Sequence, residues 1–333
     1  MNKLKIIVML FLCVALSVTF GASNVQAADN VVKIKLAQPG QDNYGIPIYL
    51  ADKLGYFADE GLEVEFVNFK SSPLSIAAML AGEAQFTLTS YDQALKMYEK
   101  GRVLKNLITT TEKHPWAILA RPEIKTVPEL KGKTISAKMP GSGPRAFVST
   151  ILIRNGLDPE KDVKFAALPG PAIIPSYDNG AIDATFASGN LKFELLSRGA
   201  KVLVDMNDPK QHKAMLGSDT YPHKVVMATA EYIQANPEVV QHFINAMVRA
   251  MKWEENQDSA KIAEMVAPYL LGPQDEKIIA DLRKPFSHDG IITPEGHKAI
   301  EQITIDVGLI KNPVPMDEVV DVTFVKKALE NIK

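Results

Sequence analysis

The sequence contains an internal repeat with an offset of about one hundred residues. The segment GEAQFTLTS at 82–90 is answered by GAIDATFAS at 180–188. Further matches keep nearly the same offset: Pro39-Gly40 with Pro140-Gly141, Gly55 with Gly156, Phe66 with Phe165, and Gly101 with Gly199. Two copies are too few for a solenoid, which needs at least three repeats to bury a continuous core. The repeat therefore predicts two α/β lobes that face each other across a cleft, a preferred place for a small ligand.

The first 27 residues have the pattern of a secretory signal peptide. Lys3 and Lys5 precede an almost wholly apolar run at 6–20, and Val25-Gln26-Ala27 places small residues at −3 and −1. This pattern predicts cleavage near Ala27. An uncleaved anchor is disfavoured because the apolar run is shorter than the ~20 residues that a membrane span needs. We therefore expect a periplasmic protein.

The sole cysteine, Cys13, lies inside this segment, and Leu12 before it is too large for a lipoprotein signal. The mature chain would have no disulfide, no thiol chemistry and no cysteine-based metal site. It would carry 35 basic and 39 acidic side chains, a mildly acidic balance without a basic block. Nucleic-acid binding therefore has little electrostatic support.

Strand-like and helix-like segments alternate through both copies, which favours parallel pairing in the sheets. We expect strands at 31–37, 62–69, 86–89 and 134–138, and helices at 46–54, at 73–82 behind Ser72 as N-cap, at 91–100 and at 145–155.

The chain becomes helical from about Val225. A helix beginning at 236–238 places its apolar residues at three- and four-residue spacing, which indicates one packed face rather than a ligand site. We expect shorter helices at 262–270, 276–282, 294–307 behind Thr293 as N-cap, and 319–332.

Ligands meet an α/β lobe at the carboxyl ends of its strands, where helix N-termini present free N–H groups that favour anions. Five such junctions are rich in Ser, Thr, Gly and Pro: 41–45, 71–72, 89–91, 141–145 and 188–190. An ordinary helix cap explains any single junction, but their equivalent places in both copies favour a ligand site. The candidate ligand-binding residues are Tyr44, Ser71, Ser72, Thr89, Ser90, Tyr91, Ser142, Gly143, Arg145, Ser188 and Asn190.

For three of these candidates, both a ligand-binding interpretation and an ordinary structural one are open. The Arg145 guanidinium could hold an oxyanion through two hydrogen bonds, or be a solvated side chain in the first turn of its helix. Tyr44 and Tyr91 could form an apolar wall with a polar tip, or pack within their lobe.

The run at 45–62 (GIPIYLADKLGYFADEGL), the VPELKGK at 127–133 and the GAIDA at 180–184 resemble landmarks of one family. This is the nitrate/sulfonate/taurine type of periplasmic solute-binding protein of ABC importers. Its wider superfamily includes binders of thiamine-pyrimidine precursors. The likeness extends from about Val32 to Met206.

The resemblance implies an α/β, type II-like periplasmic binding protein that closes on its ligand like a hinge. Each lobe would hold a mixed, mostly parallel sheet flanked by helices, followed by a helical C-terminal region. The implied domains are a signal peptide at 1–27, a first lobe at 28–117, a second lobe at 118–222, and a return to the first lobe with C-terminal helices at 223–333. Residues commonly lining the family cleft would be Ser71, Ser72, Tyr91, Ser142 and Asn190, with Arg145 close by.

One departure from the family bears on the ligand. Sulfonate binders often carry a tryptophan and an acid at the junction that reads Ser188-Gly189-Asn190-Leu191-Lys192 here. We expect a small organic anion, of the sulfonate, taurine or nitrate kind. The alternatives are an aromatic or heterocyclic ligand such as a pyrimidine precursor, a flavin or an aromatic acid, or a role as periplasmic sensor or adaptor.

An enzyme is the alternative class of protein, and the sequence contains little that supports catalysis. There is no HExxH motif, no pair of histidines four residues apart and no Gly-x-Ser-x-Gly elbow. The superfamily's pyrimidine-forming enzyme depends on a cysteine-rich motif that this chain lacks. We expect a monomeric binding protein without catalysis, metal or cofactor, whose partner is an ABC permease with its cytoplasmic ATPase.

Overall fold

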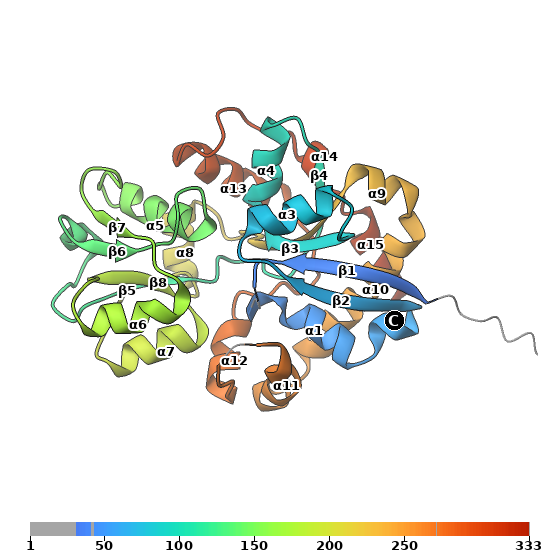
Figure 1. The fold of residues 1–333 in the computed structure, drawn as a ribbon, viewed down its shortest axis with the longest axis horizontal. Helices are drawn as coiled ribbons and strands as arrows, with labels where there is room; N and C mark the ends of the chain where they lie inside the picture. The colour runs from blue at the N-terminus through green and yellow to red at the C-terminus, as the bar shows by residue number, and fades with distance from the viewer. Residues whose placement is uncertain (1–30, 41–42, 271, 333) are drawn as a thin grey trace, which may run out of the picture. The chain divides into compact units, whose positions relative to one another are not determined.

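Two five-stranded sheets organise the chain (Figure 1). The computed structural model describes residues 31–40, 43–270 and 272–332, and these fall in one compact unit. The predicted signal peptide lies outside the described residues.

The first sheet has the strand order β2-β1-β3-β10-β4. β1 pairs in parallel with β2 and β3, whereas β10 is antiparallel to both β3 and β4. Its strands are β1 (Val32–Gln38), β2 (Leu62–Asn68), β3 (Phe86–Ser90), β4 (Leu104–Thr109) and β10 (Lys224–Thr229).

The second sheet has the order β7-β6-β8-β5-β9. β6 pairs in parallel with β7 and β8, and β5 is antiparallel to β8 and β9. Its strands are β5 (Ala117–Ala120), β6 (Thr134–Ser136), β7 (Lys164–Ala166), β8 (Ala184–Ala187) and β9 (Lys201–Asp205).

The two sheets are built to the same plan, as the internal repeat predicts. The repeated segments supply β3 and β8, and each is the third strand of its sheet. The fourth, antiparallel strand of each sheet enters from outside the repeat: β10 returns to the first sheet and β5 opens the second. The chain therefore passes between the sheets twice, after β4 and after β9.

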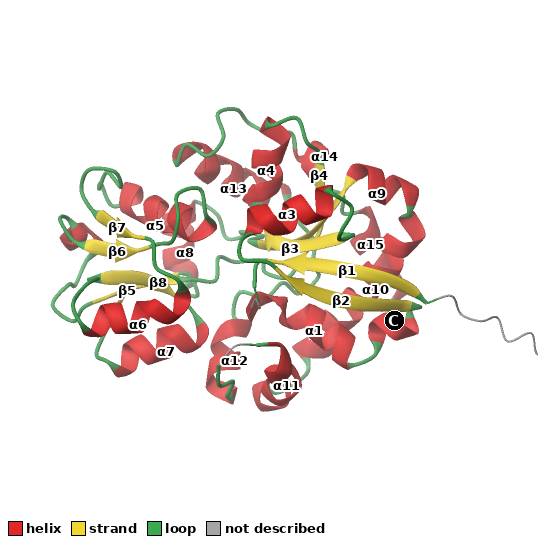
Figure 2. Cartoon of the chain, viewed as in Figure 1, coloured by secondary structure: helices red, strands yellow, loops and turns green. Residues whose placement is uncertain are grey.

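Helices cover both sheets (Figure 2). Strands of the first sheet are contacted by α2, α3, α4, α9, α14 and α15, and strands of the second sheet by α7 and α8. The helices are α1 (Ile46–Lys53), α2 (Tyr56–Asp59), α3 (Ser72–Leu80), α4 (Asp92–Glu99), α5 (Gly143–Arg154), α6 (Gly170–Asp178), α7 (Gly189–Ser197), α8 (Pro209–Leu216), α9 (Ala230–Ala235), α10 (Pro237–Glu255), α11 (Ser259–Val266), α12 (Glu276–Arg283), α13 (Pro294–Asp306), α14 (Met316–Val319) and α15 (Thr323–Asn331), with short 3₁₀ turns at Asn43–Gly45, Val127–Leu130 and Ala267–Tyr269.

The predicted amphipathic helix is α10, and its apolar face is buried. Phe243 stacks between Phe57 of α2 and Phe86 of β3, with ring centroids 5.0 and 4.3 Å away. The other members of that face are also buried: Val240, Ile244, Met247, Val248 and Met251. The core-packing prediction for this helix is confirmed.

Three predicted boundaries were wrong. The N-cap of α3 is Ser71, and Ser72 and Pro73 begin the helix. The strand at 134–138 ends at Ser136, because Lys138 takes a left-handed conformation with φ of 55°. The helix predicted at 319–332 begins only at Thr323, because Val320 is extended and forms a bridge to Asn106 of β4.

No helix in the described part of the chain is long and apolar enough to cross a membrane.

Candidate functional site

The two segments that cross between the sheets carry matching tripeptides. His114-Pro115-Trp116 precedes β5, and Tyr221-Pro222-His223 precedes β10. Each tripeptide has a proline between two ring-bearing side chains, and proline holds its own φ near −65°. The crossing segments therefore place four rings at the junction of the two sheets.

These rings pack with two phenylalanines of the second lobe. His114 stacks on Phe147 of α5, with centroids 4.3 Å apart and an interplanar angle of 16°. Trp116 lies 5.1 Å from Phe186 of β8 and 4.9 Å from His223. We call His114, Trp116, Phe147, Phe186, Tyr221 and His223 the hinge cluster.

Burial disfavours the protonated form of two histidines here, His114 of the cluster and His212 beside it. His212 Nδ1 donates to the Ser218 carbonyl at 3.0 Å, so its Nε2 accepts the His114 backbone N–H, also at 3.0 Å. Burial lowers the pKa of His212, and burial with His223, His212 and Lys224 nearby holds the pKa of His114 well below its ordinary value. His114 Nδ1 is fully buried without a hydrogen-bond partner.

A cavity of about 20 Å³ adjoins the hinge cluster, with room for about one water molecule. Asp92 of α4 and Thr304 of α13 line one side, and Gly143 and Phe147 of α5 line the other, together with His114, Tyr221 and His223. Burial acts to raise the pKa of Asp92, but the Lys96 ammonium and the Ser90 hydroxyl outweigh it and the pKa falls below its ordinary value. The cavity thus combines a carboxylate, two imidazoles and aromatic rings.

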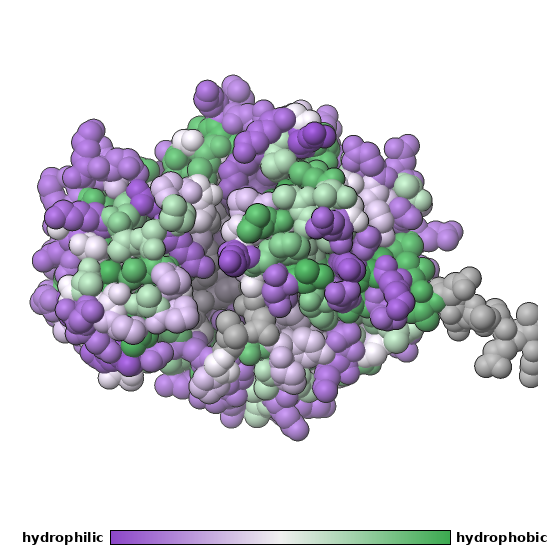
Figure 3. Space-filling view, viewed as in Figure 1, coloured by the Kyte–Doolittle hydropathy of each residue, from purple (hydrophilic) through white to green (hydrophobic). Residues whose placement is uncertain are grey.

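The start of α5 meets the first lobe at the hinge cluster. A Cβ built on Gly143 would lie 3.7 Å from the Trp116 ring and 3.8 Å from the Ser90 hydroxyl. Two of the predicted site residues, Ser90 and Gly143, are therefore neighbours although they come from different lobes. The surface is hollowed between the two lobes on the face that Figure 3 shows.

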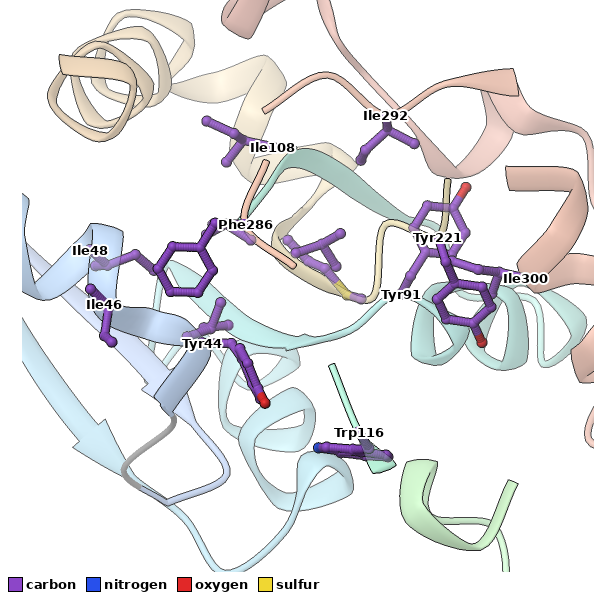
Figure 4. Close-up of a cluster of buried hydrophobic side chains, with 14 of the residues drawn as sticks. Tyr44, Ile46, Ile48, Tyr91, Ile108, Trp116, Tyr221, Phe286, Ile292 and Ile300 are labelled. Atoms are coloured by element: carbon purple, nitrogen blue, oxygen red, sulfur yellow. The ribbon is translucent and has the colours of Figure 1, made fainter. Parts of the chain in front are cut away.

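The two predicted tyrosines have different surroundings. The Tyr44 hydroxyl donates to the Pro115 carbonyl at 3.1 Å, beside Trp116 (Figure 4). The fully buried Tyr91 turns instead toward α13, where its hydroxyl meets His297 Nδ1 at 2.6 Å. Tyr44 thus adjoins the hinge cluster, and Tyr91 packs within the first lobe.

Arg145 is engaged on the outer side of α5. Its guanidinium carbon lies 3.2 Å from the centroid of the Phe165 ring, and Nη2 forms an ion pair with Glu160 at 2.8 Å. Ser142 is the N-cap of α5, its hydroxyl accepting the Arg145 N–H at 3.4 Å. Whether either residue contacts a ligand stays a prediction.

The remaining predicted residues are dispersed. Ser71 and Ser188 are N-caps without a side-chain capping bond. Thr89 is buried in β3, and its hydroxyl has no hydrogen-bond partner. Asn190 lies against Gly272, whose built Cβ would be 3.0 Å from the amide nitrogen. The structure does not bring Ser71 or Ser72 to the hinge cluster, and the ligand-binding role of the whole set stays a prediction.

Three cations on helices α4, α5 and α7 have carboxylate partners. Lys96 pairs with Asp92 and Lys192 with Asp205, both at 2.8 Å, as Arg145 does with Glu160. Within residues 31–40, 43–270 and 272–332, no group of three or more histidine, cysteine or acidic residues could hold a metal ion.

Sequence reasoning overlooked His114, Trp116 and His223, because the histidines were tested only as metal ligands. The usable signal was the paired tripeptides, each placed just before the antiparallel strand of a sheet. The tripeptides can be recognised as a pair only once it is known that the chain crosses between the sheets at these two points.

Relatives of this chain are known among curated proteins. A protein from Bacillus subtilis named as a binding protein, YtlA, is 20% identical over 95% of this chain and 96% of its own length. One named as an aliphatic sulfonates-binding protein, also from Bacillus subtilis, is 24% identical over 85% of each chain. The riboflavin-binding protein RibY of Chloroflexus aurantiacus is 27% identical over 62% of this chain and 57% of its own length.

Solved structures share the fold. A protein from Bordetella bronchiseptica RB50 superposes with a TM-score of 0.78 at 24% identity, over 91% of this chain and 98% of its own. The fold class predicted from the sequence, a periplasmic binding protein with two α/β lobes and a helical C-terminal region, is confirmed. The family model described as NMT1/THI5 like matches residues 42–259, more than half of the sequence. The chain therefore belongs to the NMT1/THI5-like family.

Proposed function

We propose that this protein is the substrate-binding component of an ABC-type importer, which captures a small ligand between its lobes and delivers it to a membrane permease. Support comes from the two-lobed fold and from relatives named as binding proteins. The two crossing segments act as the hinge, and closure follows from the extra contacts that a ligand makes with the second lobe.

The favoured ligand carries a planar aromatic or heterocyclic ring. The single observation that carries this choice is the hinge cluster, in which Trp116 and the histidines His114 and His223 lie beside the start of α5. Rings gain offset-stacked or edge-to-face contacts with such side chains, and a neutral imidazole can donate or accept a hydrogen bond. The riboflavin-binding relative is consistent with a ring-bearing ligand.

A small organic anion, which the sequence favoured, is the second candidate. It would meet the start of α5 beside Ser90, where free backbone N–H groups favour negative charge. The sulfonate-binding relative supports it. The pairing of Lys96, Arg145 and Lys192 with carboxylates counts against it, because an anion would have to compete for each cation.

The proposed setting is the periplasm, reached through a signal peptide cleaved near Ala27, with the protein acting as a monomer beside the permease and its ATPase. The proposed first lobe consists of residues 28–117 and the return at 223–333, which includes the C-terminal helices, and the proposed second lobe of residues 118–222. The role is binding without catalysis. A periplasmic sensor would use the same ligand but would not restore uptake to a strain that lacks the protein.

The test uses the two tryptophans of the chain. Trp253→Phe leaves Trp116 as the sole indole reporter, and the protein is unfolded and refolded to remove any bound ligand. Flavins, pyrimidines and aromatic carboxylates are compared with taurine, alkanesulfonates and nitrate. We expect a ring-bearing ligand to quench Trp116 emission. The same ligand should stabilise the fold by about 2.7 kcal/mol at one hundred times its Kd.

The matched control is Trp116→Phe, in which Trp253 reports instead. Quenching that persists in this variant would place the ligand away from the hinge cluster. Stabilisation by sulfonates or nitrate alone would favour a small anion over a ring-bearing ligand. No response to either group would contradict both ligand classes.

A further inference from the structure

Helix α7 of the second lobe packs against helix α12, which belongs to the first. α12 packs on α11, and α11 on α1. Along the α7–α12 contact, a Cβ built on Gly189 would lie 3.1 Å from Leu282, and the Lys277 ammonium lies 4.8 Å from the centroid of the Phe193 ring. The absence of a side chain at Gly189 lets the two helices approach closely.

A buried ion pair lies in the middle of this contact. Lys192 Nζ of α7 binds both carboxylate oxygens of Asp281 of α12, at 3.1 and 3.2 Å. Their side chains are only 8% and 7% exposed. The same ammonium binds Asp205 at the end of β9 at 2.8 Å, within its own lobe.

Asp281 has two further partners, one from each side of the junction. Lys284, one turn along α12, donates to Asp281 at 3.0 Å, and the Asn207 amide lies 3.4 Å from the same carboxylate oxygen. Burial opposes the charge of Lys192, but Asp205 and Asp281 outweigh it and raise its pKa. The ammonium therefore binds carboxylates of both lobes at once.

A buried pair of this kind discriminates between arrangements more than it adds stability, because both ions lose their hydration when they are buried. If the lobes met in a different register, Lys192 and Asp281 would each lose a charged partner across the junction, which is unfavourable for groups that are buried. The ion pair that joins α5 to α13 discriminates less between arrangements of the two lobes. Arg154 pairs with Asp306 at 3.1 Å with 39% and 30% of the side chains exposed, and exposed pairs contribute little.

We propose that Lys192 is a positioning residue for lobe closure, which fixes the closed register by bridging Asp205 of the second lobe to Asp281 of the first. This inference rests on the hinged closure of the proposed function but on no particular ligand. Its test needs no ligand, so a failed ligand screen would leave it open to measurement.

The experiment measures the distance between spin labels on the two lobes. In a Cys13→Ser background, Leu74→Cys on α3 and Met139→Cys before α5 supply the label sites, since these side chains are 49% and 64% exposed. Lys192→Met removes the bridging ammonium. Its matched control, Lys284→Met, removes the other ammonium from Asp281 but leaves the bridge between the lobes.

We expect Lys192→Met to add a longer-distance component that is absent from the unsubstituted protein and from Lys284→Met. A second pair of variants, Asp281→Asn and Asp205→Asn, keeps the proposal testable if Lys192→Met does not fold. Asp281→Asn removes the carboxylate across the junction and should add the same component, whereas Asp205→Asn removes the one on the same side and should not. Circular dichroism checks that each variant is folded.

Two results would overturn the proposal. One is an unchanged distance distribution in folded Lys192→Met or Asp281→Asn. The other is an equal shift in the two control variants, because the effect would then follow from losing any charge near Asp281 rather than from breaking the bridge.

Discussion

The imidazole rings of His114 and His223 lie 4.7 Å apart, centroid to centroid, at an interplanar angle of 43°. They come from the two segments by which the chain crosses between its sheets. A movement of one lobe against the other must change the backbone of both segments, and the ring packing at this point changes with it. The packing of the hinge cluster should therefore change when the lobes move.

Acidification should destabilise the fold through its buried histidines. Burial lowers the pKa of His114, His212 and His297 below the ordinary 6.5. Below pH 6.5 the unfolded chain takes up protons that the folded chain does not, so the stability that these groups contribute is present above that pH and is lost as the pH falls toward their folded pKa values. Each group can contribute up to about 1.4 kcal/mol per pH unit.

Urea unfolding between pH 7.5 and 5 measures this slope. His212→Gln should reduce it, because glutamine keeps an acceptor for the His114 N–H without the titration. His288→Gln is the control, since that side chain is 74% exposed. A slope that is the same in both variants and in the unsubstituted protein would contradict the prediction.

Tyr91→Phe should destabilise the first lobe. His297 Nε2 donates to the Val314 carbonyl at 2.9 Å, so Nδ1 is the acceptor of the Tyr91 hydroxyl. Removing that hydroxyl leaves a buried acceptor unsatisfied, which costs about 1–3 kcal/mol. Thermal and urea unfolding measure the loss, and Tyr98→Phe in α4, the helix that Tyr91 precedes, is the control. Equal stability in the two variants would show that the Tyr91–His297 bond contributes nothing.

Arg145→Ala distinguishes a structural arginine from an anion anchor. Because the guanidinium already packs on Phe165 and pairs with Glu160, we expect a loss of stability of about 1 kcal/mol, as for a partly exposed cation–π contact. Affinity for the ligand found in the screen should change less than twofold. A loss of about 1.5–3 kcal/mol in binding, with stability unchanged, would instead make Arg145 the anchor of a charged ligand.

Replacing either of two glycines in first turns of helices by alanine should change the stability of the fold to different extents. A Cβ on Gly296 of α13 would lie 2.5 Å from Pro222 Cδ, so Gly296→Ala should cost about 1–3 kcal/mol by overpacking against the second crossing segment. A Cβ on Gly143 of α5 meets its nearest neighbour at 3.7 Å, an ordinary contact, so Gly143→Ala should leave stability nearly unchanged. Equal melting temperatures for the two variants would contradict the close approach of α13 to Pro222.

Local signals in the sequence predicted most of the fold. The repeat predicted two equivalent sheets because β3 and β8 perform the same packing task in each. The spacing of Val240, Phe243 and Met247 predicted the buried face of α10, and Thr293 was correctly identified as an N-cap, accepting the Gly296 N–H at 3.0 Å. These features depend on neighbours a few residues away or on a repeated pattern, so a single sequence contains them.

Only the tertiary structure decided which chemical groups meet at the candidate site. Trp116 and His223 are brought together by antiparallel strands that enter each sheet from outside the repeat, and no local pattern states that pairing. The same applies to Lys192 and Asp281, whose contact depends on how α7 and α12 pack. Arg145 in the sequence is a cation at a helix start, and its availability to a ligand depends on Phe165 and Glu160, which only folding places beside it. The sequence by itself determined the elements and the two-lobed plan because these depend on local periodicity and repetition. The charge and ring character of the site depend on contacts between distant segments, which form only when the chain is packed.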